Sequence, residues 1–139
     1  MIVVDCNVIA YLLIEGEKTS LARTLWTREN NWWMPELWLH EFLNILATNE
    51  RTGNLRLRTC QELLDLARSM FEAKSRQADM GYTLSLAARY RLTAYDAQCI
   101  ALAQSMDVFL ISEDRRLRQA VPQSVRSMKS FLESNFSNH

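Results

Sequence analysis

Two aspartates follow the two most strand-like runs of the sequence. Asp5 comes directly after the β-branched run at residues 2–4, and Asp114 comes shortly after the apolar run at residues 108–111. In α/β proteins with parallel sheets, ligands bind beyond the carboxyl ends of the strands, so both carboxylates are candidates for a site there. A helix is predicted to begin just after each aspartate, so each could instead be an N-cap.

Asp96 lies at the head of an apolar helical face. The residues three, four and seven positions after it are Cys99, Ile100 and Ala103. These spacings place all four side chains on one face of a helix. Because Thr93 precedes Asp96 by three positions, the pair nearly forms a capping box, and Asp96 could serve only the start of the helix.

Glu41 lies at the edge of another apolar helical stripe. It follows Leu37 by four positions and precedes Ile45 by four. A glutamate at such an edge is either a solvated flanking residue or an inward-leaning carboxylate, and the spacing alone allows both. Burial of a charge without a partner is costly, so the second alternative implies a functional site.

If the four acids converge, their mutual repulsion demands a cation or raised pKa values. Ligation by carboxylates alone suits a hard ion such as Mg²⁺ or Mn²⁺. Neither His40 nor His139 has the spacing of a zinc ligand. No Gly-rich phosphate loop is present, and no Ser or Cys nucleophile has a suitable His base. Asn7 and Ser112 stand beside the first and last aspartates and could cap helices or orient the site.

The surrounding elements predict one α/β domain. The chain has 139 residues, of which 48% are hydrophobic and 23% charged, as is usual for a single globular domain. Strands that alternate with helices favour a layered domain with a mainly parallel sheet. The predicted strands are residues 2–4, 32–34, 73–77, 108–111 and 125–128. The predicted helices are residues 7–14, 19–28, 36–51, 58–72, 80–90, 94–106 and a short one from residue 115.

Charge, cysteines and termini narrow the class of protein. Sixteen basic residues balance sixteen acidic ones, so attraction to nucleic acid must come from local patches. The first residues show neither the basic n-region nor the long apolar h-region of a signal peptide, and no apolar run is long enough to span a membrane. We therefore expect a cytoplasmic protein without a targeting segment. Its three cysteines form neither a disulfide framework nor a metal clip and are expected to be reduced and buried.

The sequence resembles the PIN-domain family and, within it, the VapC-type toxins of toxin–antitoxin pairs. Four motifs occur in the family's order and spacing and together cover about residues 1–130. They are Ile2-Val3-Val4-Asp5-Cys6-Asn7-Val8-Ile9, Pro35-Glu36-Leu37-Trp38-Leu39-His40-Glu41, Leu92-Thr93-Ala94-Tyr95-Asp96-Ala97-Gln98-Cys99-Ile100-Ala101-Leu102-Ala103 and Phe109-Leu110-Ile111-Ser112-Glu113-Asp114-Arg115-Arg116-Leu117.

The resemblance implies a three-layer α/β/α sandwich and a metal-dependent endoribonuclease. A single PIN-like domain would occupy residues 1–133, followed by a short polar tail at residues 134–139. The resemblance further implies Mg²⁺ or Mn²⁺ as cofactor, RNA as substrate, a small antitoxin as protein partner and a homodimer. Its catalytic and metal-binding residues map to Asp5, Glu41, Asp96 and Asp114, and the accompanying polar positions map to Asn7 and Ser112.

The last motif departs from the family in two places. Ser112 stands where Thr is usual, and Arg115, Arg116 and Leu117 follow Asp114 where many members carry another acidic residue. The fullest metal set is therefore absent, which favours a single-ion or weakly bound site. The arginines at 115, 116 and 118 could track an RNA backbone or could form a solvated helix face. The four tryptophans could stack bases but are more typical of a core or an interface.

Three other functions fit parts of the pattern. A PIN-like module could bind RNA or a protein partner without cutting, as the missing acid suggests. A DNA-directed nuclease would use the same chemistry. An aspartyl-phosphate receiver also has an Asp after an apolar strand, but here the accompanying acidic pair and the later Lys are missing. Metal-dependent cleavage of RNA, compared with DNA, separates these alternatives.

Overall fold

Five short strands form one parallel sheet in the computed structural model, which describes residues 1–137. The strand order is β3-β2-β1-β4-β5, and every neighbouring pair is parallel. Val3 in the central strand pairs with Trp33 on one side and with Leu110 on the other. The strands are β1 (Ile2–Val4), β2 (Trp32–Pro35), β3 (Ser75–Arg76), β4 (Leu110–Ile111) and β5 (Val125–Arg126).

The alternation of side chains along β1 explains why helices cover both faces of the sheet. Ile2 and Val4 point into one hydrophobic core, and Val3 points into the other. All three residues are fully buried, as expected for a strand with a layer on each side. The three-layer α/β/α sandwich with a parallel sheet is therefore confirmed.

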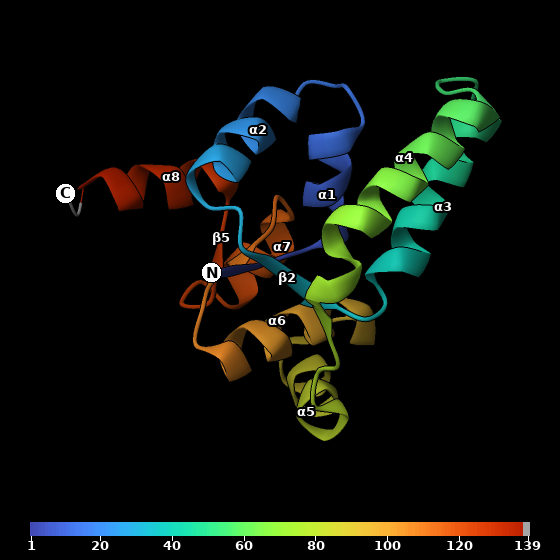
Figure 1. Ribbon diagram of the computed structural model, residues 1–139. Helices are drawn as coiled ribbons and strands as arrows, with labels where there is room; N and C mark the ends of the chain where they lie inside the picture. Colours follow the sequence, from blue (N-terminus) through green and yellow to red (C-terminus); the bar gives the residue numbers. More distant parts are fainter. Residues whose placement is uncertain (138–139) are drawn as a thin grey trace.

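The helices divide between the two faces (Figure 1). One layer contains α1 (Cys6–Leu13), α2 (Thr19–Arg28), α3 (Trp38–Arg51), α4 (Leu57–Phe71) and α8 (Met128–Ser137). The other contains α5 (Met80–Tyr90), α6 (Ala94–Met106) and α7 (Arg115–Ala120). A single 3₁₀ turn, Glu72–Lys74, joins α4 to β3.

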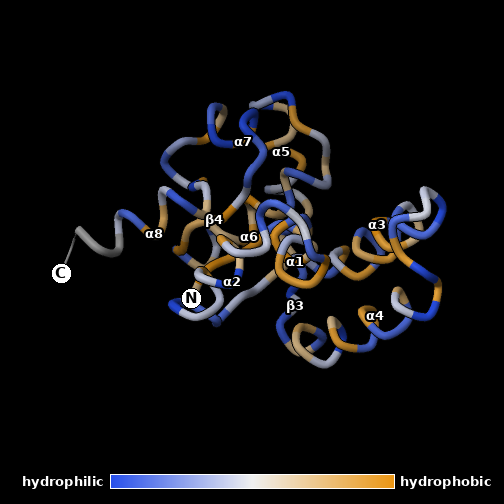
Figure 2. Tube along the Cα trace, turned by 90° about the horizontal axis from the view of Figure 1, so that it is seen from above, coloured by the Kyte–Doolittle hydropathy of each residue, from blue (hydrophilic) through white to orange (hydrophobic). Residues whose placement is uncertain are grey.

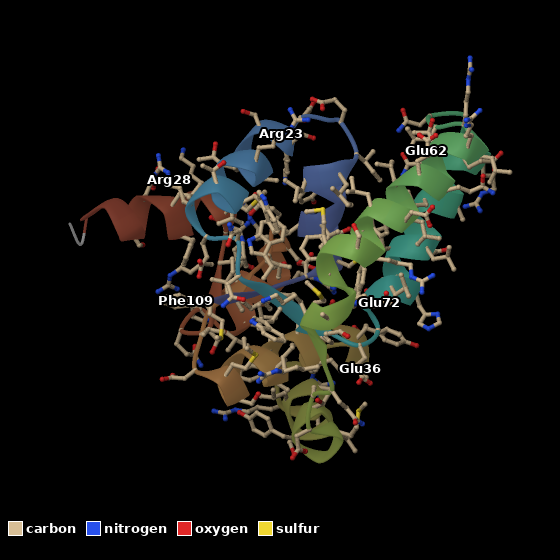
Figure 3. All side chains as sticks on the ribbon, viewed as in Figure 1. Arg23, Arg28, Glu36, Glu62, Glu72 and Phe109 are labelled. Carbon is tan, nitrogen blue, oxygen red and sulfur yellow. The ribbon has the colours of Figure 1, made fainter. Side chains whose placement is uncertain are left out.

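Helices α3 and α4 form a hairpin that extends from the body of the molecule (Figures 1 and 2). Hydrophobic and hydrophilic residues alternate along both helices in Figure 2, the pattern of amphipathic helices. Glu62 and Glu72, labelled in Figure 3, pair with arginines one helical turn earlier, Arg58 and Arg68. Between the two helices, leucines and Cys60 line an apolar cavity of about 410 Å³.

An aromatic cluster fills the core beneath the first helical layer. The Trp32 ring stacks on Phe71 with 5.8 Å between centroids, and Trp26 meets both rings edge-on. Trp38 approaches Phe71 at 6.0 Å. Trp32, Trp38 and Phe71 are each at most 3% exposed. These two tryptophans therefore belong to the core, one of the two places that are typical of this residue type.

Most predicted elements are confirmed, but three begin two residues later than predicted. Strand β3 starts at Ser75 instead of residue 73, because the 3₁₀ turn occupies Glu72–Lys74. Helix α3 starts at Trp38 instead of residue 36, because Pro35 pairs with Arg76 as the last residue of β2. Strand β4 starts at Leu110 instead of residue 108, because the preceding residues close α6. Asp107 adopts a left-handed conformation, and the Val108 N–H donates to the Ala103 carbonyl.

Helix α8 was not predicted. The predicted strand at residues 125–128 ends at Arg126, because Ser127 begins the helix by accepting a hydrogen bond from the Ser130 N–H. Phe131 and Leu132 then pack into the first core. The helix runs to Ser137 and thus through the first part of the predicted polar tail, of which residues 138–139 lie outside the described residues.

Cys6, Cys60 and Cys99 are free and buried, as predicted. Among residues 1–137, no helix is long and apolar enough to cross a membrane.

Candidate active site

One cavity of about 220 Å³ lies at the carboxyl ends of the strands and collects all four predicted acids. Asp5, Glu41, Asp96 and Asp114 all line it, although they come from four distant parts of the chain. Asn7 lines the same cavity. The sequence left open whether the four acids converge, and the structure places them around one cavity.

Asp5 is fixed at the end of β1 by hydrogen bonds to both of its carboxylate oxygens. Its Oδ1 accepts from the Asn7 N–H at 2.8 Å, which makes Asp5 the N-cap of α1. Its Oδ2 accepts from the Ser112 hydroxyl. The Asp5 side chain thus caps α1 and also lines the cavity, so the two interpretations of this residue are compatible.

Ser112 connects the first aspartate with the last. Its side chain is fully buried, and its hydroxyl, besides donating to Asp5, accepts from the Asp114 N–H at 3.1 Å. Asp114 in turn accepts from the Arg116 N–H at 2.8 Å and caps α7. A single buried hydroxyl therefore sets the relative positions of the loops after β1 and β4.

Asp96 and Glu41 enter the cavity from helices on opposite faces of the sheet. Thr93 caps α6 by accepting from the Asp96 N–H at 3.1 Å, which leaves the Asp96 carboxylate directed to the cavity. Glu41 lies in the first turn of α3 and is partly buried. Thr93 therefore caps α6 while the Asp96 carboxylate lines the cavity, so the capping interpretation does not exclude the active-site interpretation.

Burial and, after it, nearby negative charges raise the pKa values of Asp5, Glu41 and Asp96. Burial, followed by the negative charges of Asp5 and Asp96, raises the pKa of Glu41 to about 7. Burial also raises the pKa of Asp5, against the hydrogen bonds from Ser112 and Asn7. The pKa of Asp96 is raised by burial and by Asp114, partly opposed by Thr93 and Arg116. The site therefore holds more negative charge than its own contacts neutralise.

The donor set fits a hard divalent cation. Carboxylate oxygens are the ligands such ions prefer, and raised pKa values indicate a missing positive charge. Within residues 1–137, the acidic, His and Cys side chains as placed form no group of three close enough to ligate one ion directly. Mg²⁺ usually keeps several waters and uses one or two carboxylates, so this spacing suits an ion held partly through water.

Five further residues, which the sequence analysis did not assign to the cavity, also line it: Cys6, Asn44, Ile45, Tyr95 and Cys99. Burial and the nearby carboxylates raise the pKa values of both thiols, so they remain protonated and form neutral walls. Asn44 follows Glu41 by one helical turn, and Tyr95 directly precedes Asp96. Both spacings were visible in the sequence and could have identified these residues.

Glu113 points away from the cavity and clamps the loop that carries the last aspartate. Its Oε2 accepts from the Met128 N–H at 3.2 Å at the start of α8, and its Oε1 lies 3.8 Å from the Lys18 ammonium. The side chain is 13% exposed. The adjacent acid is therefore no substitute for the missing family carboxylate.

The three predicted RNA-contact arginines have different surroundings. Arg115 and Arg116 are exposed at the start of α7, and Arg116 lies beside two of the carboxylates. Arg118 is only partly exposed, and its Nε is buried without a hydrogen-bond partner among the described residues. The first two are accessible to an RNA backbone, whereas Arg118 is less so.

Comparisons with known proteins agree with this geometry. The sequence model of the PIN domain matches residues 2–121. Ribonuclease VapC3 of Pyrobaculum aerophilum is 28% identical over 124 residues, which are 87% of this chain and 95% of that protein. The crystal structure of PAE2754 from P. aerophilum has a TM-score of 0.75 at 21% identity and covers 96% of this chain and 94% of its own. FitAcB from Neisseria gonorrhoeae has a TM-score of 0.70 at 15% identity, over 93% and 99% of the two chains.

Proposed function

Because the chain belongs to the PIN domain family, we propose that it is a metal-dependent endoribonuclease that acts at the cavity of four carboxylates. The observation that carries the proposal is the convergence of Asp5, Glu41, Asp96 and Asp114 with raised pKa values on three of them. A purely structural set of helix caps has no need to face one cavity. The name of the relative, Ribonuclease VapC3, supports RNA as the substrate.

Each residue has a definite part in this proposal. The four carboxylates would hold Mg²⁺ or Mn²⁺, and the bound ion would lower the pKa of a water and neutralise charge on the scissile phosphate. Ser112 and the Asn7 N–H hold the Asp5 carboxylate in place from either side. Glu41, with a pKa of about 7, carries a proton for part of the time at neutral pH and releases it when a cation binds.

The cellular part of the proposal rests on the resemblance to VapC-type toxins. We expect the protein to act in the cytoplasm as the toxin of a toxin–antitoxin pair, restrained by a small antitoxin and assembled as a homodimer. Exposed leucines on the α3–α4 hairpin, Leu43 and Leu57 among them, offer the kind of apolar surface that protein partners cover. Size-exclusion chromatography with light scattering, alone and after co-expression with the adjacent gene product, tests both partners.

Cleavage of a mixed RNA pool tests the enzymatic part. Purified protein is incubated with the pool with and without Mn²⁺ or Mg²⁺, beside the Asp96→Asn variant and a matched DNA pool. We expect metal-dependent cutting of RNA that falls at least 100-fold in the variant. Asparagine keeps the size of the side chain, and the Thr93 cap is untouched, so the comparison isolates the charge.

The second candidate is a PIN-like module that binds RNA or a protein without cutting. Two observations favour it: Arg116 follows the last aspartate in place of an acid, and no ready-made ligand cluster exists among the described side chains. RNA binding by wild type and Asp96→Asn, with no cleavage by either on any substrate, would establish this function instead. Preferential cutting of DNA would establish the related DNA nuclease.

A further inference from the structure

Arg116 lies where the sequence departs from its family. It occupies the first turn of α7, two residues after Asp114, in the stretch where many PIN domains carry another acid. Leu117, the next residue, is buried and fixes the helix against the second core. The rotation of α7 is therefore set by packing, and it leaves Arg116 at the mouth of the cavity.

Arg116 contacts two of the four carboxylates. Its Nη2 lies 3.8 Å from Asp96 Oδ2, and its Nε lies 3.9 Å from Asp114 Oδ1. Within residues 1–137, both ion pairs that reach the four acids come from this one guanidinium. The side chain of Arg116 is 75% exposed, whereas those of Asp96 and Asp114 are 31% and 35% exposed. Arg116 therefore lies on the solvent side of the two carboxylates, where no packing among the described residues holds its guanidinium in place.

A divalent cation in the cavity and the Arg116 guanidinium would both pair with the carboxylates of Asp96 and Asp114. An ion held near Asp96 and Asp114 repels the guanidinium and takes over its partners. We propose that Arg116 is the chain's own counter-ion: it competes with the divalent cation for Asp96 and Asp114, and once displaced it binds the phosphate of the RNA substrate. This inference rests on the proposed metal-dependent function and identifies what sets its metal affinity.

The displaced side chain is well placed for its second role. Because its side chain is 75% exposed, a displaced Arg116 would turn into solvent and still lie beside the cavity that Asp96 and Asp114 line. The planar fork of a guanidinium matches phosphate oxygens as well as carboxylate oxygens. The same residue that lowers metal affinity would therefore strengthen substrate binding.

Arg115 provides a matched control for the experiment. It carries the same charge in the same turn of α7 and is exposed, and among the described residues it shows no ion pair with the four acids. Removal of either arginine changes the general electrostatic field equally. Only the Arg116 substitution removes the contacts with Asp96 and Asp114, so the difference between the two variants isolates those contacts.

Calorimetric titration of MnCl₂ into the metal-free full chain, without RNA, tests the competition. We expect Arg116→Gln to bind Mn²⁺ about three- to tenfold more tightly than wild type, and Arg115→Gln to stay within about twofold. In an Asp96→Asn background, the gain from Arg116→Gln should shrink, because one of its two partners is gone. At saturating Mn²⁺, Arg116→Gln should also raise KM for RNA several-fold more than Arg115→Gln does, with a smaller change in kcat.

The outcomes separate this inference from the function it rests on. Equal gains in the two glutamine variants, or weaker Mn²⁺ binding by Arg116→Gln, overturn the competition. An unchanged KM in Arg116→Gln overturns the phosphate contact. If neither wild type nor any variant binds Mn²⁺ or Mg²⁺, the metal-dependent function itself fails, and the inference fails with it.

Discussion

The aromatic cluster and the carboxylate cavity lie in the same small domain, yet their side chains act on stability in opposite directions. Trp32 and Phe71 stack in a dry core, and every contact they make favours the folded state. Asp5, Glu41 and Asp96 have raised pKa values, because folding buries these carboxylates and brings negative charges near one another. The first region holds the fold together, and the second is held in place by it. The residues that pack the core are thus different from those proposed to carry the chemistry, although Asp5 and Asp114 also cap helices.

The largest effect should come from the aromatic cluster. Phe71→Ala removes a ring that touches three tryptophans and is 1% exposed, so we expect a loss of about 3–5 kcal/mol in the free energy of unfolding. Urea unfolding followed by tryptophan fluorescence measures it. Leu66→Ala, on the exposed side of the same helix, should cost less than about 0.5 kcal/mol. A small loss in Phe71→Ala would mean that the cluster is not what stabilises the domain.

The carboxylate cavity should show the opposite sign and a dependence on pH. In the folded, metal-free protein Glu41 keeps its proton up to about pH 7, whereas in the unfolded chain it releases the proton near pH 4.5. The folded state therefore binds more protons between these values, and stability falls as the pH rises through that window. Glu41→Gln removes this loss. After allowance for its partial exposure, we expect the variant to gain about 1–2 kcal/mol above pH 7 and almost nothing below pH 4.5.

Thermal unfolding at pH 5 and pH 8 in the presence of a chelator measures the difference. Glu50→Gln is the control, because it removes an exposed carboxylate from the same helix at a position that does not line the carboxylate cavity. Equal behaviour of the two variants would remove the evidence that Glu41 is strained by its neighbours. Addition of Mn²⁺ should reverse the ranking, because the cation stabilises wild type more than Glu41→Gln.

The smallest effect separates capping from charge at the start of α6. Thr93→Ala removes the side chain that accepts from the Asp96 N–H and should cost about 1 kcal/mol. Metal-free Asp96→Asn should be as stable as wild type or more so, because it relieves repulsion within the cavity. Melting temperatures of both variants with chelator provide the comparison. A clear loss in Asp96→Asn would show that this aspartate serves the helix more than the cavity.

Much of the fold could be predicted because the pattern is local. The β-branched run Ile2–Val4 and the helices α2, α5 and α6 follow from periodicity and from caps such as Thr93. Helix α8 could not be predicted in this way. Four serines lie in the helix or directly before it, so its local preference is weak. It forms because Phe131 and Leu132 dock into the core.

The candidate site could be predicted as a set of residues but not as an arrangement. Four acids in unusual places are visible in the sequence, and the structure brings them to one cavity. From the sequence, helix capping and a place in the site looked like alternatives for Asp5 and Asp114. The structure shows that each side chain caps a helix and also lines the cavity. The direction of Glu113 and the position of Arg116 depend on loop geometry and on the packing of α7, and no periodicity encodes either.

The capping role of the aspartates also bears on how such a chain would evolve. Asparagine caps a helix about as well as aspartate, and a single nucleotide change converts one codon into the other. At Asp114, that change would keep the bond to the Arg116 N–H group and remove a charge that repels Asp96. In a lineage without selection for the cavity, such substitutions would be neutral or stabilising and would accumulate early. The acids would then be among the first residues lost to drift, while the fold around them survived.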